Sequence, residues 1–252
     1  MIKMQDKKTF KITIEYDGTN YFGWQKQQHK RYKTIQSEIE KSLKKVLHKS
    51  VKLTGSGRTD KGVHAINQVA SFESTTNLCP KPLTSALNSY LNDDIRIKDI
   101  RITKTNFHAR FSAKSKTYRY LILNQEKPSV FLRHYAWHIK EKLDLELMKK
   151  TKKYLLGTKN FKAFVNEPKG INSFTRELID ISISKSRNIV TIDITSTGFL
   201  RGMVRNLVKL ITDVGLKKIS LSEINKITKT ENRSLIGKSA PAQGLYLYQV
   251  KY

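Results

Sequence analysis

The sequence predicts an α+β fold of two related strand and helix halves, ferredoxin-like in element order, that share a mostly antiparallel or mixed central sheet. Segments with the two-residue alternation of strands are interleaved, along the 252 residues, with segments that have the spacing of helices. The order strand, helix, strand, helix, strand occurs about twice. Several consecutive strands are joined by links short enough for hairpins, which favours antiparallel pairing.

The first half begins with a predicted strand at residues 10–16, where apolar and polar residues alternate. Asp17-Gly18 follows this strand as a turn signal. A helix is predicted from Ile35 to Leu47, because apolar residues recur there every four positions and Thr34 can cap the first turn.

The remaining elements of the first half surround a glycine-rich loop. Val51–Leu53 is expected to be extended and to enter this loop, and a strand over Val69–Phe72 is expected to leave it. Pro82–Leu91 is predicted to be a helix, since its leucines share one side and a proline is tolerated in a first turn. Ile95–Ile102 is predicted to form a further strand or strand pair.

The second half has a related order of elements. Its predicted strands, all with alternating apolar residues, are Tyr118–Leu123, Ile179–Ser184, Ile189–Thr195 and Leu245–Val250. The second and third of these are predicted to form a hairpin across Arg187-Asn188. Asp144 can cap a helix that ends near Gly157. Gly202–Val214 has the apolar face of a second helix, and Ser220 with Glu223 forms a capping box for a third.

The two halves join near Lys104–Phe111, where no linker of low complexity occurs. We therefore expect an N-terminal α+β half at residues 1–105 and a C-terminal α+β half at residues 106–252, packed firmly together.

The charge of the chain points to its partner. Lysine and arginine number 48 against 21 acidic residues, which gives a net charge of +27. A charge of this size indicates partners and not fold, and nucleic acid is the first polyanion to consider. A lysine-rich composition that only decorates the surface is the alternative.

Composition also indicates the compartment. The single cysteine, Cys79, cannot form an internal disulfide, which favours a reducing environment. No apolar stretch approaches the roughly 18 residues that a membrane-spanning helix needs. Residues 1–11 are basic but lack the following apolar run of a signal peptide. We therefore expect a cytoplasmic protein with no membrane partner.

The most informative segment is Gly55–Ala65, which reads GSGRTDKGVHA. Its three glycines allow tight turns, and it places Asp60 between Arg58 and Lys61. Nearby positive charge favours the ionised carboxylate, which can act as a nucleophile or base. A structural turn in which Asp60 caps backbone amides is the simpler alternative.

Two other kinds of site are excluded by spacing. Gly57 and Gly62 are spaced as in a Walker phosphate loop, but the lysine and hydroxyl residue that should follow are absent. His134 and His138 would share a helix face, yet Trp137 and the alternation around it favour a strand that separates them. We expect neither a nucleoside triphosphate site nor a metal site.

Four further blocks accompany this loop: YDGT and YFGWQ within Tyr16–Gln25, FHARFSA and KTYRY within Phe107–Tyr120, GFLRGMVRN at Gly198–Asn206, and APAQGL at Ala240–Leu245. Together, and in this order over nearly the whole chain, the five blocks resemble the signatures of the tRNA pseudouridine synthase A family. The resemblance implies an isomerase that converts uridine of tRNA to pseudouridine without cofactor, metal or external energy.

The resemblance also assigns roles to individual residues. Asp60 corresponds to the catalytic aspartate, which attacks either ribose C1′ or uracil C6, a choice that the sequence leaves open. Tyr118 corresponds to an active-site tyrosine that stacks on the uracil, and Arg205 to an arginine that pairs with the aspartate. Without the resemblance, Tyr118 would be interpreted as an ordinary strand aromatic.

RNA contacts are expected from several cations. Arg58 resembles the residue that fills the gap left by the extruded base. Arg201, Arg205 and Lys209 recur every four residues and are predicted to form one basic stripe on a helix. Arg110 is a further candidate phosphate contact. The resemblance implies a homodimer that acts on the anticodon stem-loop of tRNA at nucleotide positions 38 to 40.

The main alternative is a non-catalytic RNA-binding protein. Such a protein would have the same charge and fold, but it would have no use for the carboxylate of Asp60.

Overall fold

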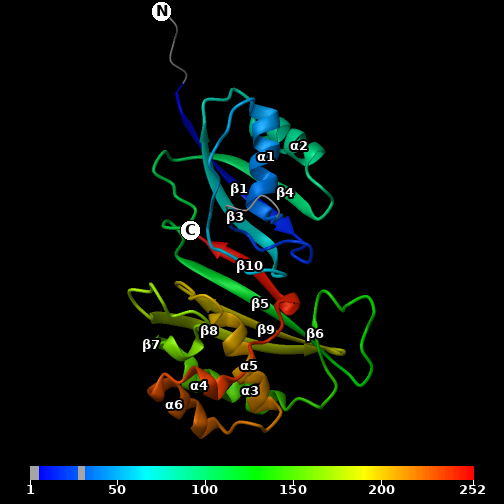
Figure 1. Cartoon of the computed structure of the whole chain (residues 1–252), viewed down its shortest axis with the longest axis vertical. Coiled ribbons are helices and arrows are strands. Elements are labelled where there is room, and N and C mark those ends of the chain that lie inside the picture. Colours follow the sequence, from blue (N-terminus) through cyan, green and yellow to red (C-terminus); the bar gives the residue numbers. More distant parts are fainter. Residues whose placement is uncertain (1–5, 28–31) are drawn as a thin grey trace, which may run out of the picture. The chain divides into compact units, whose positions relative to one another are not determined.

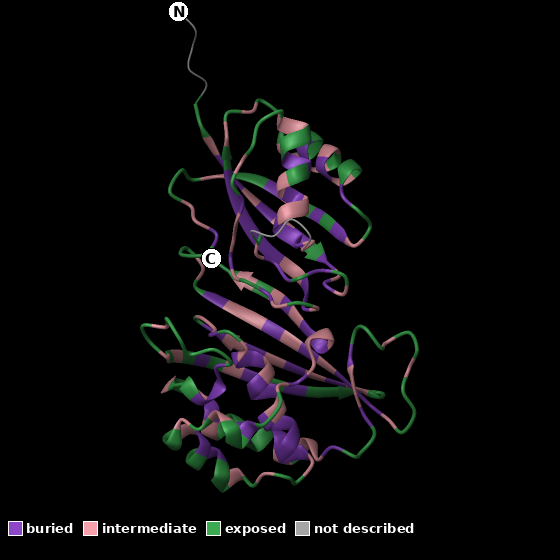
Figure 2. Cartoon of the chain, in the orientation of Figure 1, coloured by how far each residue is buried: buried purple, intermediate pink, exposed green. Residues whose placement is uncertain are grey.

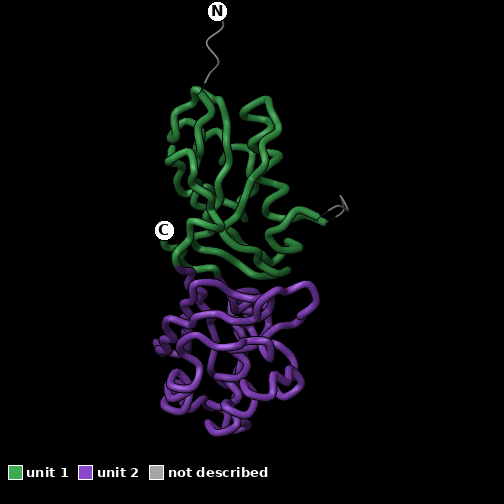
Figure 3. Tube along the Cα trace, turned by 90° about the vertical axis from the view of Figure 1, so that its left-hand side faces the viewer, with its two compact units in different colours: residues 1–114, 247–252 green, residues 115–246 purple. Residues whose placement is uncertain are grey.

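The computed structural model describes residues 6–27 and 32–252. They form two compact units, unit 1 within residues 1–114 and 247–252 and unit 2 within residues 115–246 (Figure 3). The C-terminal residues thus return to unit 1, which element order alone does not predict. The domain boundary after residue 105 stays a prediction. Residues 1–5, part of the segment judged not to be a signal peptide, lie outside the described residues.

Unit 1 contains strands in the order β4-β1-β3-β10, of which β10 belongs to unit 1 from Leu247 on. Strand β1 pairs antiparallel with β4 and with β3, and β2 pairs antiparallel with β3 beside this path. These strands are β1 (Lys8–Tyr16), β2 (Thr54–Gly55), β3 (His64–Ser74), β4 (Ile95–Thr103) and β10 (Leu245–Lys251). Phe10 of β1 lies opposite Phe72 of β3, and their rings stack with centroids 5.0 Å apart. The alternation predicted for residues 10–16 therefore has one fully buried side.

Two helices accompany this sheet, α1 (Ile35–Leu47) and α2 (Pro80–Tyr90) (Figure 1). Thr34 caps α1 as predicted, since its side chain accepts a hydrogen bond from the backbone of Ser37. Helix α2 begins at Pro80 and not at Pro82, and the first turn tolerates both prolines. The buried faces, purple in Figure 2, form a core of Phe10, Ile12, Ile14, Ile35, Ile39, Leu43, Leu83 and Leu87.

Unit 2 contains strands in the order β5-β9-β8-β7, antiparallel throughout, with β6 parallel to β5. Their bounds are β5 (Ser115–Asn124), β6 (Trp137–Ile139), β7 (Gly157–Asn160), β8 (Thr175–Ser186) and β9 (Ile189–Ser196). The predicted hairpin is β8–β9, which turns at Arg187 with a φ of 53°. The predicted α+β class with a mostly antiparallel, partly mixed sheet is confirmed.

The helices of unit 2 are α3 (Leu145–Lys150), α4 (Lys152–Leu155), α5 (Met203–Gly215) and α6 (Leu221–Thr230), with 3₁₀ turns at Lys162–Phe164, Arg233–Ile236 and Ala242–Gly244. Asp144 caps α3, and Ser220 with Glu223 forms the predicted capping box of α6. The single helix predicted after Asp144 is divided at Thr151, whose hydroxyl donates to the carbonyl of Met148 at 2.6 Å.

Val51–Leu53, which was predicted to be extended, has no regular secondary structure, and the strand that enters the glycine-rich loop is the short β2. One sequence expectation needs correction. Arg201 is not on a helix, because Gly202 adopts a φ of +77° and α5 starts only at Met203. Arg201 therefore cannot extend a helical stripe through Arg205 and Lys209.

Candidate active site

The glycine-rich loop connects β2 to β3 in unit 1. Its start is fixed by the Ser56 amide, which donates to the Val69 carbonyl at 2.7 Å, and its tip by the Val63 amide, which donates to the Asp60 carbonyl at 3.2 Å. Gly62 between them has a φ of +76°, which favours glycine. Asp60 is half-buried at this turn, whereas the neighbouring Arg58 and Lys61 are exposed. The loop thus presents one carboxylate beside two cations.

A buried polar network lies beneath this tip. The Tyr16 hydroxyl is 2.8 Å from Thr59 Oγ1, one residue before Asp60. Gln68 accepts from the Ser56 hydroxyl at 2.7 Å and donates to the Gly57 carbonyl at 3.0 Å. These side-chain bonds replace the backbone pairing that an irregular loop lacks, so they fix its conformation.

The Tyr16–Gln25 block packs directly on the loop. The Trp24 amide donates to the Thr59 carbonyl at 3.1 Å. Gly23 has a φ of +83°, and a Cβ added there would lie 2.4 Å from the Thr59 carbonyl oxygen. Gly18 approaches as closely, with Val63 O 2.0 Å from where its Cβ would be. Both glycines are therefore required by the close approach of the two segments.

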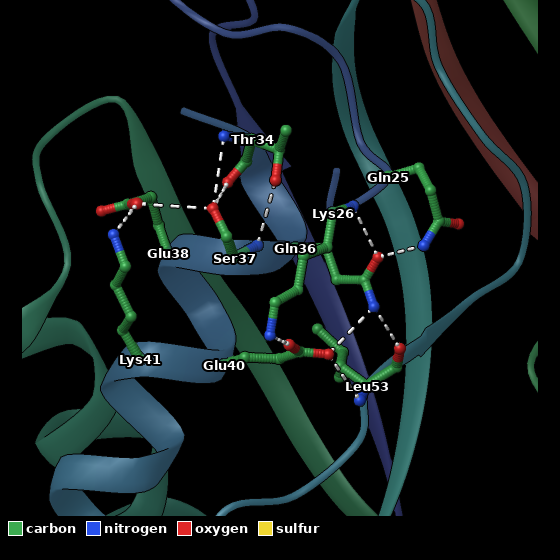
Figure 4. A network of polar contacts seen from close by, with 9 residues as sticks. All are labelled: Gln25, Lys26, Thr34, Gln36, Ser37, Glu38, Glu40, Lys41 and Leu53. Atoms are coloured by element: carbon green, nitrogen blue, oxygen red, sulfur yellow. Dashed lines mark hydrogen bonds and ion pairs between the residues drawn. The ribbon is translucent and has the colours of Figure 1, made fainter. Parts of the chain in front are cut away.

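Gln36 on α1 forms hydrogen bonds to the end of the Tyr16–Gln25 block and to the chain that precedes the glycine-rich loop (Figure 4). Its side-chain oxygen accepts from Gln25 Nε2 at 2.7 Å and from the Lys26 amide at 3.0 Å. Its side-chain nitrogen donates to the Leu53 carbonyl and to Glu40, each at 2.9 Å. One buried amide thus holds the end of the Tyr16–Gln25 block and the chain that enters the loop.

Arg110 lies on a separate turn of unit 1. The Nδ1 of His108 accepts the amides of Arg110 and Phe111, both at 3.2 Å. Arg110 is exposed, and its guanidinium lies 5.4 Å from the centroid of the Phe111 ring. This rigid turn leaves the cation accessible to an anion.

In unit 2, Tyr118 lies on β5 opposite Ile194, and it is buried. Its ring meets Phe199 edge-on, with centroids 5.1 Å apart. Tyr120 lies two residues on with the same orientation, but its hydroxyl donates to the Pro241 carbonyl at 2.8 Å. Burial raises the pKa of Tyr120, which keeps this hydroxyl protonated. The two tyrosines therefore have different surroundings.

Arg205 lies on the first turns of α5. Its Nε donates to the Ala240 carbonyl at 2.6 Å, and the Ala240 amide donates back to the Arg205 carbonyl at 3.3 Å. The fully buried Asn206 donates to Phe164 O at 2.8 Å and accepts from the Ser239 hydroxyl at 2.6 Å. The Gly198–Asn206 and Ala240–Leu245 blocks are thereby bound together.

The predicted basic stripe is divided among three environments. Arg201 is exposed before the helix and pairs with Glu167. Lys209 pairs with Asp213 on α5, whereas Arg205 is bound to Ala240. The stripe is therefore not one continuous cationic surface, and each cation has its own protein contact.

The structure brings Arg58 and Asp60 together on one loop of unit 1, and it holds Tyr118 and Arg205 in regular elements of unit 2. The supporting residues Tyr16, Gln36, Thr59 and Gln68 were not predicted from the sequence. All four are buried in the structure, but a polar or phenolic side chain carries no mark in the sequence of the partner that it will meet.

Two further features of the described part of the chain concern metal ligands and membrane spans. Within residues 6–27 and 32–252, no group of three or more His, Cys, Asp or Glu side chains could hold a metal ion. His138, one of the two spaced histidines, has Nε2 2.8 Å from the Gln125 carbonyl. No helix in this described part is long and apolar enough to cross a bilayer.

Comparison with known proteins agrees with the sequence blocks. A family model described as tRNA pseudouridine synthase matches residues 12–112 and 152–252. The tRNA pseudouridine synthase A of Acetivibrio thermocellus is 44% identical over 96% of this chain and 98% of its own length. That of Caldicellulosiruptor saccharolyticus is 42% identical over the same shares. A solved Cbf5-Nop10-Gar1 complex, at 13% identity and a TM-score of 0.33 over 81% of this chain and 45% of that one, is too distant to carry an argument.

Proposed function

The chain belongs to the tRNA pseudouridine synthase family, and we propose that it isomerises uridine to pseudouridine at nucleotide positions 38 to 40 of the tRNA anticodon stem-loop. The observation that carries this proposal is the loop tip of unit 1. There, a half-buried carboxylate lies between two exposed cations and is fixed from below by buried hydrogen bonds.

The reaction needs a nucleophile and the transfer of one proton. The bond between N1 and ribose C1′ breaks, the uracil turns, and C5 bonds to C1′. The proton lost from C5 balances the one gained by N1, so no redox partner or energy source enters. Asp60 is the nucleophile, and a carboxylate held on a fixed loop can meet one face of the nucleotide.

Five other residues have proposed roles. Tyr118 stacks on the target uracil, and Arg205 offsets negative charge at the reaction centre. Arg58 occupies the space that the target base leaves when it is extruded, a step that costs about a few kcal/mol. Its exposure on the same loop as Asp60 suits that role. Arg110 and Arg201 contact phosphates, and both are exposed in their units.

We also propose how the substrate is recognised, where the protein acts and in which oligomeric state. The net charge of +27 suits a substrate recognised largely through its phosphates and shape. We place the protein in the cytoplasm as a homodimer in which one tRNA contacts both subunits. Light scattering of the purified protein with and without tRNA measures that stoichiometry.

Product mapping tests the function. The protein is incubated with an unmodified tRNA transcript, without cofactor and with a chelator present. Pseudouridine is then located by chemical labelling and primer extension. We expect modification confined to positions 38 to 40. Tight tRNA binding without any pseudouridine would favour the non-catalytic RNA-binding protein instead.

A nucleotide-binding enzyme is tested separately. Addition of ATP and magnesium is expected to leave the unfolding temperature unchanged, because Gly62 is followed by Val63 and not by the lysine of a phosphate loop. A saturable rise in unfolding temperature would contradict this.

A further inference from the structure

We propose that Tyr16 is a positioning residue for pseudouridine formation, which holds the backbone beneath Asp60 through the hydroxyl of Thr59. The inference rests on the proposed function and names a residue that acts through another and not on the uridine.

The first observation is the way in which Thr59 is fixed. Tyr16 ends β1, is buried, and has its hydroxyl 2.8 Å from Thr59 Oγ1. The Thr59 carbonyl accepts from the Trp24 amide at 3.1 Å. Thr59 is therefore held by its side chain and by its main chain. Asp60 is the next residue, so the peptide plane that starts it has little freedom left.

The second observation is that another buried side chain, Gln68 of β3, holds the other side of the same loop. The amide of Gln68 binds the Ser56 hydroxyl at 2.7 Å and the Gly57 carbonyl at 3.0 Å. Residues on both sides of Arg58 are thus connected to the two central strands of unit 1. A buried network in which each member has a partner rigidifies its surroundings.

The chemistry requires this rigidity. A displacement of the attacking group by about 1 Å can lower a rate about a hundredfold. Burial raises the pKa of Tyr16, so its hydroxyl stays protonated and available for hydrogen bonding at assay pH. The ring also packs against Trp24, with centroids 6.2 Å apart, and phenylalanine would keep that contact. Tyr16→Phe therefore removes only the hydrogen bond.

The test compares single-turnover rates and tRNA dissociation constants for wild type, Tyr16→Phe, Thr59→Val, Thr59→Ser and the Tyr16→Phe/Thr59→Val double variant. We expect Tyr16→Phe and Thr59→Val each to react about 10 to 100 times more slowly with dissociation constants within about twofold of wild type. Thr59→Ser, which keeps the hydroxyl, should restore most of the rate. The double variant should be no slower than the slower single variant, since both remove one bond.

Tyr252→Phe is the matched control. It also removes one tyrosine hydrogen bond within unit 1, the bond of 2.8 Å to the Ala109 carbonyl, and should react at the wild-type rate. Wild-type turnover by Tyr16→Phe, or rate and affinity falling together, would overturn the positioning role. If Tyr16→Phe does not fold, the Thr59→Val and Thr59→Ser pair decides. A wild type that makes no pseudouridine would overturn the proposed function instead.

Discussion

The Gly55–Ala65 loop of unit 1 and the β5 and α5 elements of unit 2 hold their candidate catalytic side chains by different means. Asp60 lies on irregular backbone, which is fixed by Tyr16 and Gln68 and by the close approach of Gly23. Tyr118 and Arg205 lie within a strand and a helix, whose own backbone hydrogen bonds already set their positions.

This difference predicts how each region fails. On the loop, only a few contacts hold the backbone. The loss of one of them should therefore displace the Asp60 carboxylate and lower the reaction rate before unit 1 unfolds. In unit 2, the anchors join elements that are regular in themselves, so their loss should appear first as lower stability. Substitutions in each region can therefore break or sharpen the comparison.

The largest effect is expected from Gly23→Ala. The new Cβ would meet the Thr59 carbonyl oxygen at 2.4 Å and strain a φ of +83°. We expect a single-turnover rate at least about a hundredfold lower. Gly170→Ala is the control, because its φ of +77° imposes similar strain with nothing within 4 Å of the added Cβ. It should destabilise by about 1 kcal/mol and keep its rate. Equal rate losses in both variants would contradict the contact argument.

A smaller effect on rate and a clear effect on stability are expected from Asn206→Ala. The change removes two donated and two accepted hydrogen bonds of a fully buried amide, with Phe164, Asn166, Arg233 and Ser239. We expect the free energy of unfolding to fall by about 3 kcal/mol, with the rate of the folded protein within about threefold of wild type. Urea unfolding and single-turnover assays measure both, and a rate loss without a stability loss would contradict the comparison.

The smallest effect is expected at the cap of α6, where Ser220 and Glu223 are exposed. Backbone and side-chain hydrogen bonds from Ser220 lower the pKa of Glu223. A lowered folded-state pKa contributes stability above the unfolded pKa, and this contribution is lost as the pH falls through the folded pKa. Glu223→Gln should therefore lower the unfolding temperature slightly at pH 7 and no longer do so in acid. A difference that persists in strong acid would contradict this origin.

Elements with local signals could be predicted from the sequence. The Thr34 cap, the Ser220 and Glu223 capping box, and the β8–β9 hairpin each depend on a few neighbouring residues. The start of α5 was predicted at Gly202 but lies at Met203, because Gly202 has a φ of +77°. A Cβ at Gly202 would also lie 2.5 Å from Asn166 Nδ2, a contact with a distant part of the chain. Spacing by four residues does not reveal such a contact.

The residues proposed to act on the RNA could be predicted from the sequence, but the buried residues that hold the loop in place could not. Asp60 stands out between glycines and cations in the sequence. Gln36 and Gln68 do not, since their partners lie far along the chain or belong to backbone carbonyls, as in the bond from Gln36 to Leu53. The separation of Arg201 from Arg205 likewise depended on one backbone dihedral angle, at Gly202.

The central claim is that the carboxylate of Asp60 is the nucleophile, and Asp60→Asn tests it most directly. Asparagine keeps the size of the side chain and removes its charge. Single-turnover pseudouridine formation and tRNA affinity are measured for wild type, Asp60→Asn and the control Asp93→Asn, an exposed carboxylate elsewhere in unit 1. We predict a rate more than about a thousandfold lower for Asp60→Asn, with tRNA affinity retained and the control unaffected. Pseudouridine formed by Asp60→Asn at the wild-type rate would contradict the account.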